Sequence, residues 1–342
     1  MKSNNRKRLP YGNSNFESVR TDGYVYVDKT RFIELLEQEE NDKLFLIRPR
    51  KFGKSLFFSM LTHYYDVCGA DKFDTLFGDL YIGKHPTPKH NELMVLKFNF
   101  SGINTTTQDD FGISFTEKIE DSVLQFLDNH KRILSEYEAL IGDVRAKKSV
   151  SGYLKIAFRA TASQNRKLFV IIDEYDHFAN DFIAMGTPEG VAFYKQNIRA
   201  NGIVRDFYET LKEGSETVIG RIMLTGITPV MLDDLTSGFN VATNLSLDPQ
   251  YNEILGFTQS EVEWLMDEAG IEPSLILVDM KQLYDGYKFN FAGEHSVYNS
   301  SMMLYFFSQL RNTNYKPERL IDDNLKMDYG RLRLLLSSEQ NR

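Results

Sequence analysis

One strand–loop–helix segment restricts the fold of this chain more than any other part of its sequence. Residues 44–47 are all apolar, residues 48–55 read Arg-Pro-Arg-Lys-Phe-Gly-Lys-Ser, and residues 56–61 are again mainly apolar. A buried strand, a tight loop and a helix in this order surround an anion with backbone N–H groups and a helix N-terminus. The segment therefore predicts a phosphate-binding loop at the end of a buried strand.

The loop departs from the usual phosphate-binding pattern, G-x-x-x-x-G-K-[ST], because Arg48 stands in place of the first glycine. A Gly-Lys-Ser triplet alone is weak evidence, since a chain of this length has roughly a one-in-five chance of containing one. The flanking strand and helix strengthen the prediction. The residues expected to contact the phosphates are Arg50, Lys51, Phe52, Gly53, Lys54, Ser55 and Leu56.

The basic residues before the glycine allow two interpretations. Arg50 and Lys51 could add positive charge near the phosphates, and Arg48 could contact a neighbouring subunit. Alternatively, these are solvated charges that flank an exposed loop. Pro49 lacks a backbone N–H, so the cradle has to use amides from about residue 50 onward.

Composition limits the class of protein. The hydrophobic share of 42% and the charged share of 26% are ordinary for a soluble globular chain. A net charge of -8 argues against broad adhesion to nucleic acid or to anionic membranes. Cys68 is the single cysteine, which excludes an intramolecular disulfide and a cysteine-rich zinc cluster. No stretch approaches the roughly 20 apolar residues of a membrane span, and no signal-peptide pattern is visible, so we expect a cytoplasmic protein.

Apolar strands alternate with helical patterns along the first 243 residues. We expect strands at 44–47, 93–100, 168–172 and 218–224, and helices at 54–67, 109–129 and 153–162. This alternation predicts an α/β fold with a parallel sheet flanked by helices. From about residue 244 the pattern favours helices at 259–269, 273–284 and 299–310. We therefore expect a core with an N-terminal extension over 1–243 and a smaller, mainly helical domain over 244–342.

Two acidic residues follow the apolar run at 168–172. Ligands of open α/β sheets bind at the carboxyl ends of strands, where Asp173 and Glu174 are expected. Asp173 could hold Mg²⁺ jointly with the Ser55 hydroxyl, and Glu174 could orient the attacking water. The alternative is that the pair only ends the strand and caps the next helix. The Gly-Lys-Ser loop earlier in the chain favours the first interpretation.

A further buried strand ends in hydroxyl residues. Either Thr225 or Thr228 could contact the γ-phosphate or the attacking water, whereas the alternative is turn chemistry around Gly226. The sequence does not choose between the two threonines. It also does not rank the arginine-finger candidates, which are Arg199, Arg205 and Arg221.

Seven segments resemble the bacterial AAA-ATPase-like family of P-loop NTPases, which is similar to the signal-transduction ATPases of the STAND type. The matching segments, in family order, are 26–30, 48–56, 171–176, 225–229, 236–240, 255–258 and 284–289. The resemblance implies a RecA-like ATPase core followed by a small helical domain, and it makes Arg48 a family trait.

The resemblance is incomplete in two places. The family's Asn-Pro pair is Asn299-Ser300 here. Members often carry a C-terminal PD-(D/E)xK nuclease-like domain, but this chain ends at Arg342 without an acidic cluster and Glu-x-Lys that could supply that chemistry. Such a domain is therefore expected to be absent or truncated.

Together, the motifs and the resemblance predict a Mg-ATP-binding ATPase whose slow hydrolysis moves the helical part. Lys54 would contact the β- and γ-phosphates. One alternative is a nucleotide-gated interaction module with negligible turnover, which would act on a protein partner or through self-association. Another, by family analogy alone, is the ATPase part of a DNA-processing or defence protein, with nucleic acid as a partner. The resemblance implies ATP over GTP, and no Asn-Lys-x-Asp guanine-binding motif is visible.

Overall fold

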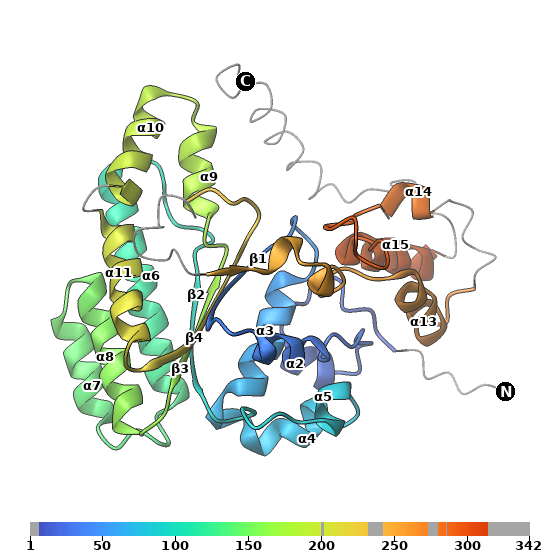
Figure 1. The fold of residues 1–342 in the computed structure, drawn as a ribbon, viewed down its shortest axis with the longest axis horizontal. Coiled ribbons are helices and arrows are strands. Elements are labelled where there is room, and N and C mark those ends of the chain that lie inside the picture. The colour runs from blue at the N-terminus through green and yellow to red at the C-terminus, as the bar shows by residue number, and fades with distance from the viewer. Residues whose placement is uncertain (1–6, 200–201, 232–241, 273–279, 285, 314–342) are drawn as a thin grey trace.

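A parallel β-sheet forms the centre of the molecule. The computed structural model describes residues 7–199, 202–231, 242–272, 280–284 and 286–313, so the expected segments 236–240 and 273–279 lie outside the described residues. Five strands run in the order β2-β3-β4-β1-β5, and all neighbours are parallel (Figure 1). They are β1 (Lys43–Ile47), β2 (Met94–Asn99), β3 (Leu168–Asp173), β4 (Ile219–Gly226) and β5 (Thr243–Asn244). The predicted α/β class is therefore confirmed.

Helices cover both faces of the sheet, which explains why every residue of β3 is buried. Even-numbered residues of β2 and β3, such as Leu96 and Val170, join one core, whereas odd-numbered ones, such as Val95 and Ile171, join the other. This alternation follows from the two-residue period of a strand.

The first core lies under α6 (Gln108–Asn129), α7 (Tyr137–Ala146), α8 (Val150–Ser163) and α11 (Ile203–Ser215). These helices stand together on one side of the sheet in Figure 1. From the carboxyl end of β3 the chain rises into α9 (His177–Ala184), α10 (Pro188–Tyr194) and a short π-helix (Lys195–Arg199). The carboxyl edge of the sheet is thus partly enclosed.

The second core lies under α3 (Lys54–Tyr65) and the N-terminal helices α1 (Phe16–Thr21) and α2 (Phe32–Gln38). Two short helices, α4 (Phe73–Phe77) and α5 (Tyr81–Lys84), complete this layer. The predicted helix over 54–67 ends earlier than expected. Asp66 has extended backbone angles, and its carboxylate accepts a hydrogen bond from Cys68 N, which starts a 3₁₀ helix over Val67–Lys72.

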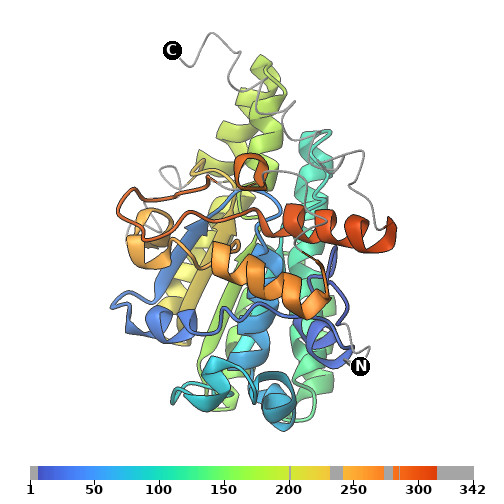
Figure 2. The ribbon, with the colours of Figure 1, turned by 90° about the vertical axis from the view of Figure 1, so that its right-hand side faces the viewer.

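A third, smaller core joins the last part of the chain to its beginning. It contains α13 (Gln259–Ala269), α14 (Met280–Tyr284) and α15 (Ser300–Thr313), together with Val25 and Val27. Two 3₁₀ turns, Leu245–Leu247 and Pro249–Tyr251, lead from β5 toward these helices. In Figure 2, which is turned toward this side, α13 lies in front of α3, and α15 lies to the right of it. None of the helices in the described part of the chain is long and apolar enough to cross a membrane.

Candidate nucleotide-binding site

The loop between β1 and α3 has the backbone shape that a phosphate cradle requires. Lys51 and Gly53 both adopt left-handed conformations, with φ of +67° and +91°. Gly53 takes this conformation at no steric cost and is also the N-cap of α3. Because no described side chain caps this helix, its first N–H groups remain available to an anion.

Lys54 lies folded into its own loop. Its Nζ donates hydrogen bonds of 2.8 Å to the carbonyl oxygens of Arg48 and Pro49. Burial lowers the pKa of Lys54 to about 8, and the charges of Asp173, Asp176 and Glu174 oppose that shift. The side chain is therefore an ammonium at neutral pH, held by two neutral acceptors.

Ser55 and Asp173 meet directly. Ser55 Oγ donates a 2.7 Å hydrogen bond to Asp173 Oδ2, although β4 lies between β1, which precedes Ser55, and β3, which ends at Asp173. Asp173 is fully buried, and its Oδ1 has no hydrogen-bond partner among the described residues. A buried carboxylate oxygen without a partner is costly unless a cation or water satisfies it. A hydroxyl and a carboxylate are oxygen ligands that suit Mg²⁺, so the residues present fit this ion.

Glu174 follows Asp173 in a strained backbone conformation. Its φ is +53°, which is uncommon for a residue that carries a side chain. The side chain lines the cavity beside the loop, and its Oε2 lies 3.5 Å from Nδ1 of His177. Nε2 of the same histidine lies 3.7 Å from Asp181 Oδ2. Glu174 is thus the carboxylate that the strand end presents to the cavity.

Both predicted threonines are engaged within the fold. Thr225 is buried, and its Oγ1 donates a 2.6 Å hydrogen bond to the carbonyl oxygen of Leu46 on the neighbouring strand. Thr228 Oγ1 lies 2.8 Å from Asp176 Oδ2 and 2.9 Å from Asn180 Oδ1. These contacts support the turn around the intervening glycine, and the proposed contact of either threonine with nucleotide stays a prediction.

Asp176 and Gly226 explain why this turn is so restricted. The carboxylate Oδ2 of Asp176 also accepts hydrogen bonds from the backbone N–H groups of Ile227 and Thr228. A Cβ added at Gly226 would lie 2.3 Å from Asp176 Oδ1 and 2.5 Å from the Tyr175 ring. Asp176 therefore connects the segment after β3 to the segment after β4, a role that the sequence motif did not reveal.

Arg48 differs from both interpretations of the sequence. It is fully buried, so it is neither a solvated charge nor a contact for a neighbouring subunit. Its guanidinium donates hydrogen bonds to the carbonyl oxygens of Ile47, Ser246 and Tyr251, and it lies 3.9 Å from the ring centroid of Phe289. Burial lowers the pKa of Arg48 to about 9, which leaves it charged at neutral pH. Arg48 ties the loop to the segment after β5.

The structure also excludes one of the three arginine-finger candidates. Arg221 lies near the start of β4, at the opposite edge of the sheet from the loop, and its buried guanidinium donates to the carbonyl oxygen of Leu36. It cannot act as a finger. Arg205 is half-exposed on α11 and pairs with Glu209, whereas the side chain of Arg199 lies outside the described part of the structure.

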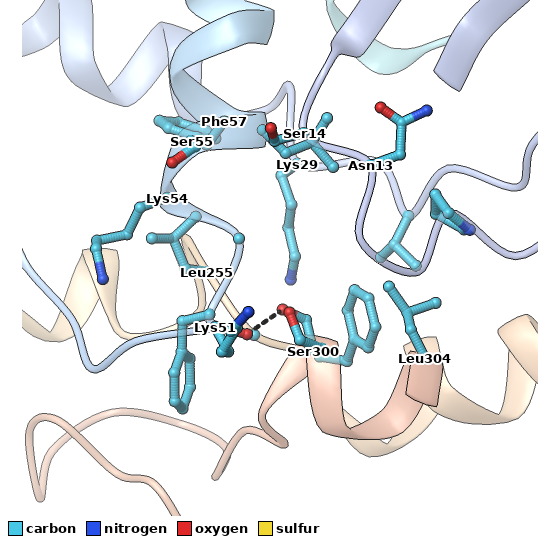
Figure 3. Close-up of a pocket in the computed structure, with 18 of the residues that line it drawn as sticks. Asn13, Ser14, Lys29, Lys51, Lys54, Ser55, Phe57, Leu255, Ser300 and Leu304 are labelled. Atoms are coloured by element: carbon cyan, nitrogen blue, oxygen red, sulfur yellow. Dashed lines mark hydrogen bonds between the residues drawn. The ribbon is translucent and has the colours of Figure 1, made fainter. Parts of the chain in front are cut away.

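Three successive carbonyl groups of the loop accept hydrogen bonds from the last part of the chain. Arg50 O accepts from Asn299 Nδ2, and Phe52 O accepts from Gly256 N. Lys51 O accepts from the backbone N–H of Ser301 and from Ser300 Oγ, the contact drawn in Figure 3. The Phe52 ring is buried edge-on against Tyr287 and Phe289. Residues 50–52 of the loop are thus attached to the start of α15 and to Gly256.

A cavity of about 350 Å³ opens beside the loop. Its walls come from the loop and the start of α3, from the N-terminal segments around residues 10–14 and 25–29, from Glu174, and from the helical part at residues 255–257, 265, 300, 301 and 304. Figure 3 shows Lys54 and Ser55 on one side of it and Ser300 and Leu304 on another. All seven predicted loop residues line the cavity, namely Arg50, Lys51, Phe52, Gly53, Lys54, Ser55 and Leu56.

Lys29 is a second buried cation near this cavity, and no role for it was predicted from the sequence. Its Nζ lies 2.7 Å from both carboxylate oxygens of Glu261 and 3.0 Å from the carbonyl oxygen of Glu253. Glu261 is also the third residue of α13 and completes a capping box with Thr258. Lys29 therefore joins the N-terminal segment to the start of α13.

A comparison with known protein families gives a match over most of the chain. A family model described as "Predicted AAA-ATPase" matches residues 10–236. The chain belongs to this family. A relative of this family member, an uncharacterized protein in the vnfD 5′ region of Azotobacter chroococcum mcd 1, is 28% identical over 309 residues. The match covers 89% of this AAA-ATPase-like chain and 52% of the relative, so the chain spans about half of the relative's length.

Replacement of Arg48 tests whether its buried guanidinium supports the site. Arg48→Met keeps most of the side-chain volume but leaves the carbonyls of Ser246 and Tyr251 without their donor. We expect the free energy of unfolding to fall by about 2–3 kcal/mol, because buried acceptors lose their partner. Chemical denaturation measures this change. The exposed neighbour Lys51→Met is the control and should change stability by less than about 0.5 kcal/mol. Equal effects of the two variants would contradict the role of Arg48.

Proposed function

We propose that this AAA-ATPase-like protein binds Mg-ATP in the loop over residues 50–56 and hydrolyses it slowly. The observation that carries the proposal is the contact between Ser55 Oγ and Asp173 Oδ2, beside which Asp173 Oδ1 is buried with no partner among the residues that the structure describes. A hydroxyl at a helix N-terminus and a carboxylate at a strand end are the two protein ligands that a magnesium–nucleotide complex requires.

Each residue of the site has a proposed role that follows from its position. Lys54 would exchange its two carbonyl acceptors for β- and γ-phosphate oxygens, which gain more from an ammonium than neutral carbonyls do. Ser55 and Asp173 would hold Mg²⁺, which neutralises charge on the transferring phosphoryl group when it is bound. Glu174 reaches the cavity and would orient the attacking water and accept its proton. Thr228, after the end of β4, is more accessible than Thr225. Its hydroxyl would exchange its hydrogen bond to Asp176 for one to the γ-phosphate, so that its position would depend on which nucleotide is bound.

The attachment of the loop to α15 supports coupling between nucleotide and the helical part. The carbonyls of Arg50, Lys51 and Phe52 already bind donors from residues 256 and 299–301. A loop that rearranges around phosphates would have to alter those contacts. Nucleotide state would therefore change the position or freedom of α15.

The same attachment favours a second candidate, a nucleotide-gated interaction module that turns over negligibly. In that case ATP or ADP would select between two conformations seen by a protein partner or by a second copy. A role with nucleic acid rests on family analogy alone and predicts DNA-stimulated turnover. We expect either activity to operate in the cytoplasm.

Removal of the loop lysine tests the proposed phosphate contact. Lys54→Ala should reduce ATP and ADP affinity by at least about 100-fold, because the variant loses a charge-assisted contact worth roughly 3 kcal/mol. Isothermal titration calorimetry measures the change. The exposed Lys155→Ala on α8 is the control and should bind like the wild type. Unchanged affinity in Lys54→Ala would refute the site.

The pKa of Lys54 predicts a pH dependence of ADP binding. The free protein lowers this pKa to about 8, and an anion favours the protonated form. Above pH 8 binding therefore has to take up a proton, so affinity should fall by up to about tenfold per pH unit. The nucleotide phosphates are already ionised in this range.

Calorimetry between pH 7 and 9.5 measures the slope. Lys54→Arg keeps its charge throughout that range and should give a flatter profile, whatever its absolute affinity. A flat profile for the wild type would show that the charge on Lys54 does not contribute to binding.

The proposed hydrolysis depends on Glu174. Glu174→Gln removes the base but keeps the shape of the side chain, so phosphate release should fall by about 10²–10⁴-fold while ATP affinity is retained. Glu213→Gln, an exposed residue on α11, is the matched control and should turn over normally. Equal, background-level release from wild type and Glu174→Gln would instead favour the nucleotide-gated module.

A further inference from the structure

A group of three potential metal ligands lies at the end of α3 that is remote from the loop. Asp66 follows the last residue of α3, Cys68 lies two residues later in the 3₁₀ helix, and His130 is the C-cap of α6. One ligand atom from each residue lies within 4.8 Å of the other two. Chain segments more than 60 residues apart thus bring an oxygen, a sulfur and a nitrogen together.

His130 is oriented as a metal ligand would be. Its side chain is fully buried, and its Nδ1 lies 2.7 Å from the carbonyl oxygen of Phe126. A carbonyl can only accept, so Nδ1 carries a proton, and in the corresponding neutral tautomer the lone pair is on Nε2. Metal-bound histidines nearly always make such a hydrogen bond from the nitrogen that does not bind the metal.

The position of Nε2 relative to Asp66 is the second observation. Nε2 lies 3.1 Å from Asp66 Oδ2, yet it makes no hydrogen bond to any described residue. The carboxylate oxygen therefore lies well away from the direction in which an N–H bond on Nε2 would point. In a buried ion pair between the two groups, the oxygen would lie along that direction. A different arrangement is expected for two atoms that bind one zinc ion. With metal bonds of about 2.0–2.2 Å at a tetrahedral angle, the two atoms lie about 3.4 Å apart, and both point at the metal instead of at each other.

Asp66 is fixed in place by the backbone. Its Oδ1 accepts a 2.8 Å hydrogen bond from Cys68 N, and its Oδ2 accepts a 3.2 Å bond from Val95 N at the start of β2. Such outer contacts orient carboxylates that bind metals. Cys68 is partly exposed, so an ion could reach the group from that side.

We propose that Asp66, Cys68 and His130 bind one Zn²⁺ ion. Thiolate, imidazole and carboxylate together suit zinc, whereas Mg²⁺ would require oxygen ligands alone. On binding, the Cys68 sulfur forms the bond to zinc and its proton passes to the solvent. The thiolate and carboxylate then balance the two charges of the ion, and solvent can supply the fourth ligand.

The ion would join three elements of the core. It would link the end of α3 and the 3₁₀ helix that follows it to the end of α6. The helices α3 and α6 pack on opposite sides of β2. The opposite end of α3 carries Ser55, so the metal would fix the helix that presents this residue to nucleotide.

Metal titration of the full chain tests the proposal without any measurement of nucleotide turnover. After treatment with chelator and reductant, the wild type should bind one equivalent of ZnCl₂ in calorimetry and should gain thermal stability. Titration with CoCl₂ should produce the thiolate-to-cobalt charge-transfer absorption of a Cys–metal bond.

Cys68→Ser is the main variant. Serine is nearly isosteric with cysteine and the position is partly exposed, so the fold should be retained. It should abolish the charge-transfer absorption and weaken Zn²⁺ binding by more than about 100-fold. Such a loss exceeds the roughly 10–100-fold loss of affinity that is typical when a residue only supports the metal ligands. His130→Gln should weaken binding similarly. His295→Ala is the matched control, because His295 belongs to an exposed group with Glu253 and Glu294 that could bind metal adventitiously.

The outcomes separate clearly. The proposal is supported if the wild type and His295→Ala bind one ion with thiolate absorption and Cys68→Ser does not. It is overturned if the wild type fails to bind stoichiometrically, if the cobalt complex lacks thiolate absorption, or if Cys68→Ser keeps its affinity for Zn²⁺.

Discussion

The hydrogen bond between Ser55 and Asp173 sets the strictest requirement on this fold. The two residues are 118 positions apart, and their oxygens lie 2.7 Å apart because β1 and β3 end at the same edge of the sheet, on either side of β4. The parallel direction of all five strands provides that common edge. The helices on both faces are needed in turn, because only a sheet covered on both sides can bury strands as apolar as β3. The site therefore depends on the whole core and not on the loop alone.

A second level of organisation surrounds the loop. Arg48 holds the segment after β5, Phe52 packs against aromatic rings from residues 287 and 289, and Lys29 holds the start of α13. Two of these three contacts use a buried cation, whose desolvation is repaid only when its hydrogen bonds are complete. The helical part is thus joined to the core by two buried cations and one aromatic contact, and two of the residues involved, Lys29 and Phe52, also line the cavity.

The sequence predicted those features that depend on long, regular patterns. The four longer strands and α6, α8 and α13 follow from apolar periodicity, and the family match confirms the resemblance found from short motifs. β5 was missed because two residues contain no periodicity. Arg48 was misread because its partners lie about 200 positions away, so no local pattern distinguishes a buried guanidinium from a solvated one. The roles of Asp176 and Lys29 were missed for the same reason, although both lie in segments that matched the family.

The way Lys54 is held would also restrict which anions the proposed phosphate loop can bind. Two carbonyl oxygens already accept hydrogen bonds from its ammonium group, so an incoming anion must replace them. These carbonyls are part of the chain and lose no translational entropy when they bind Lys54, whereas a free anion does. A small anion with one or two oxygens within reach gains little by that exchange. A chain of linked phosphates offers several charged oxygens for a single loss of translational freedom. If the loop binds nucleotide as proposed, its resting state would therefore favour polyanions over small anions such as inorganic phosphate and chloride.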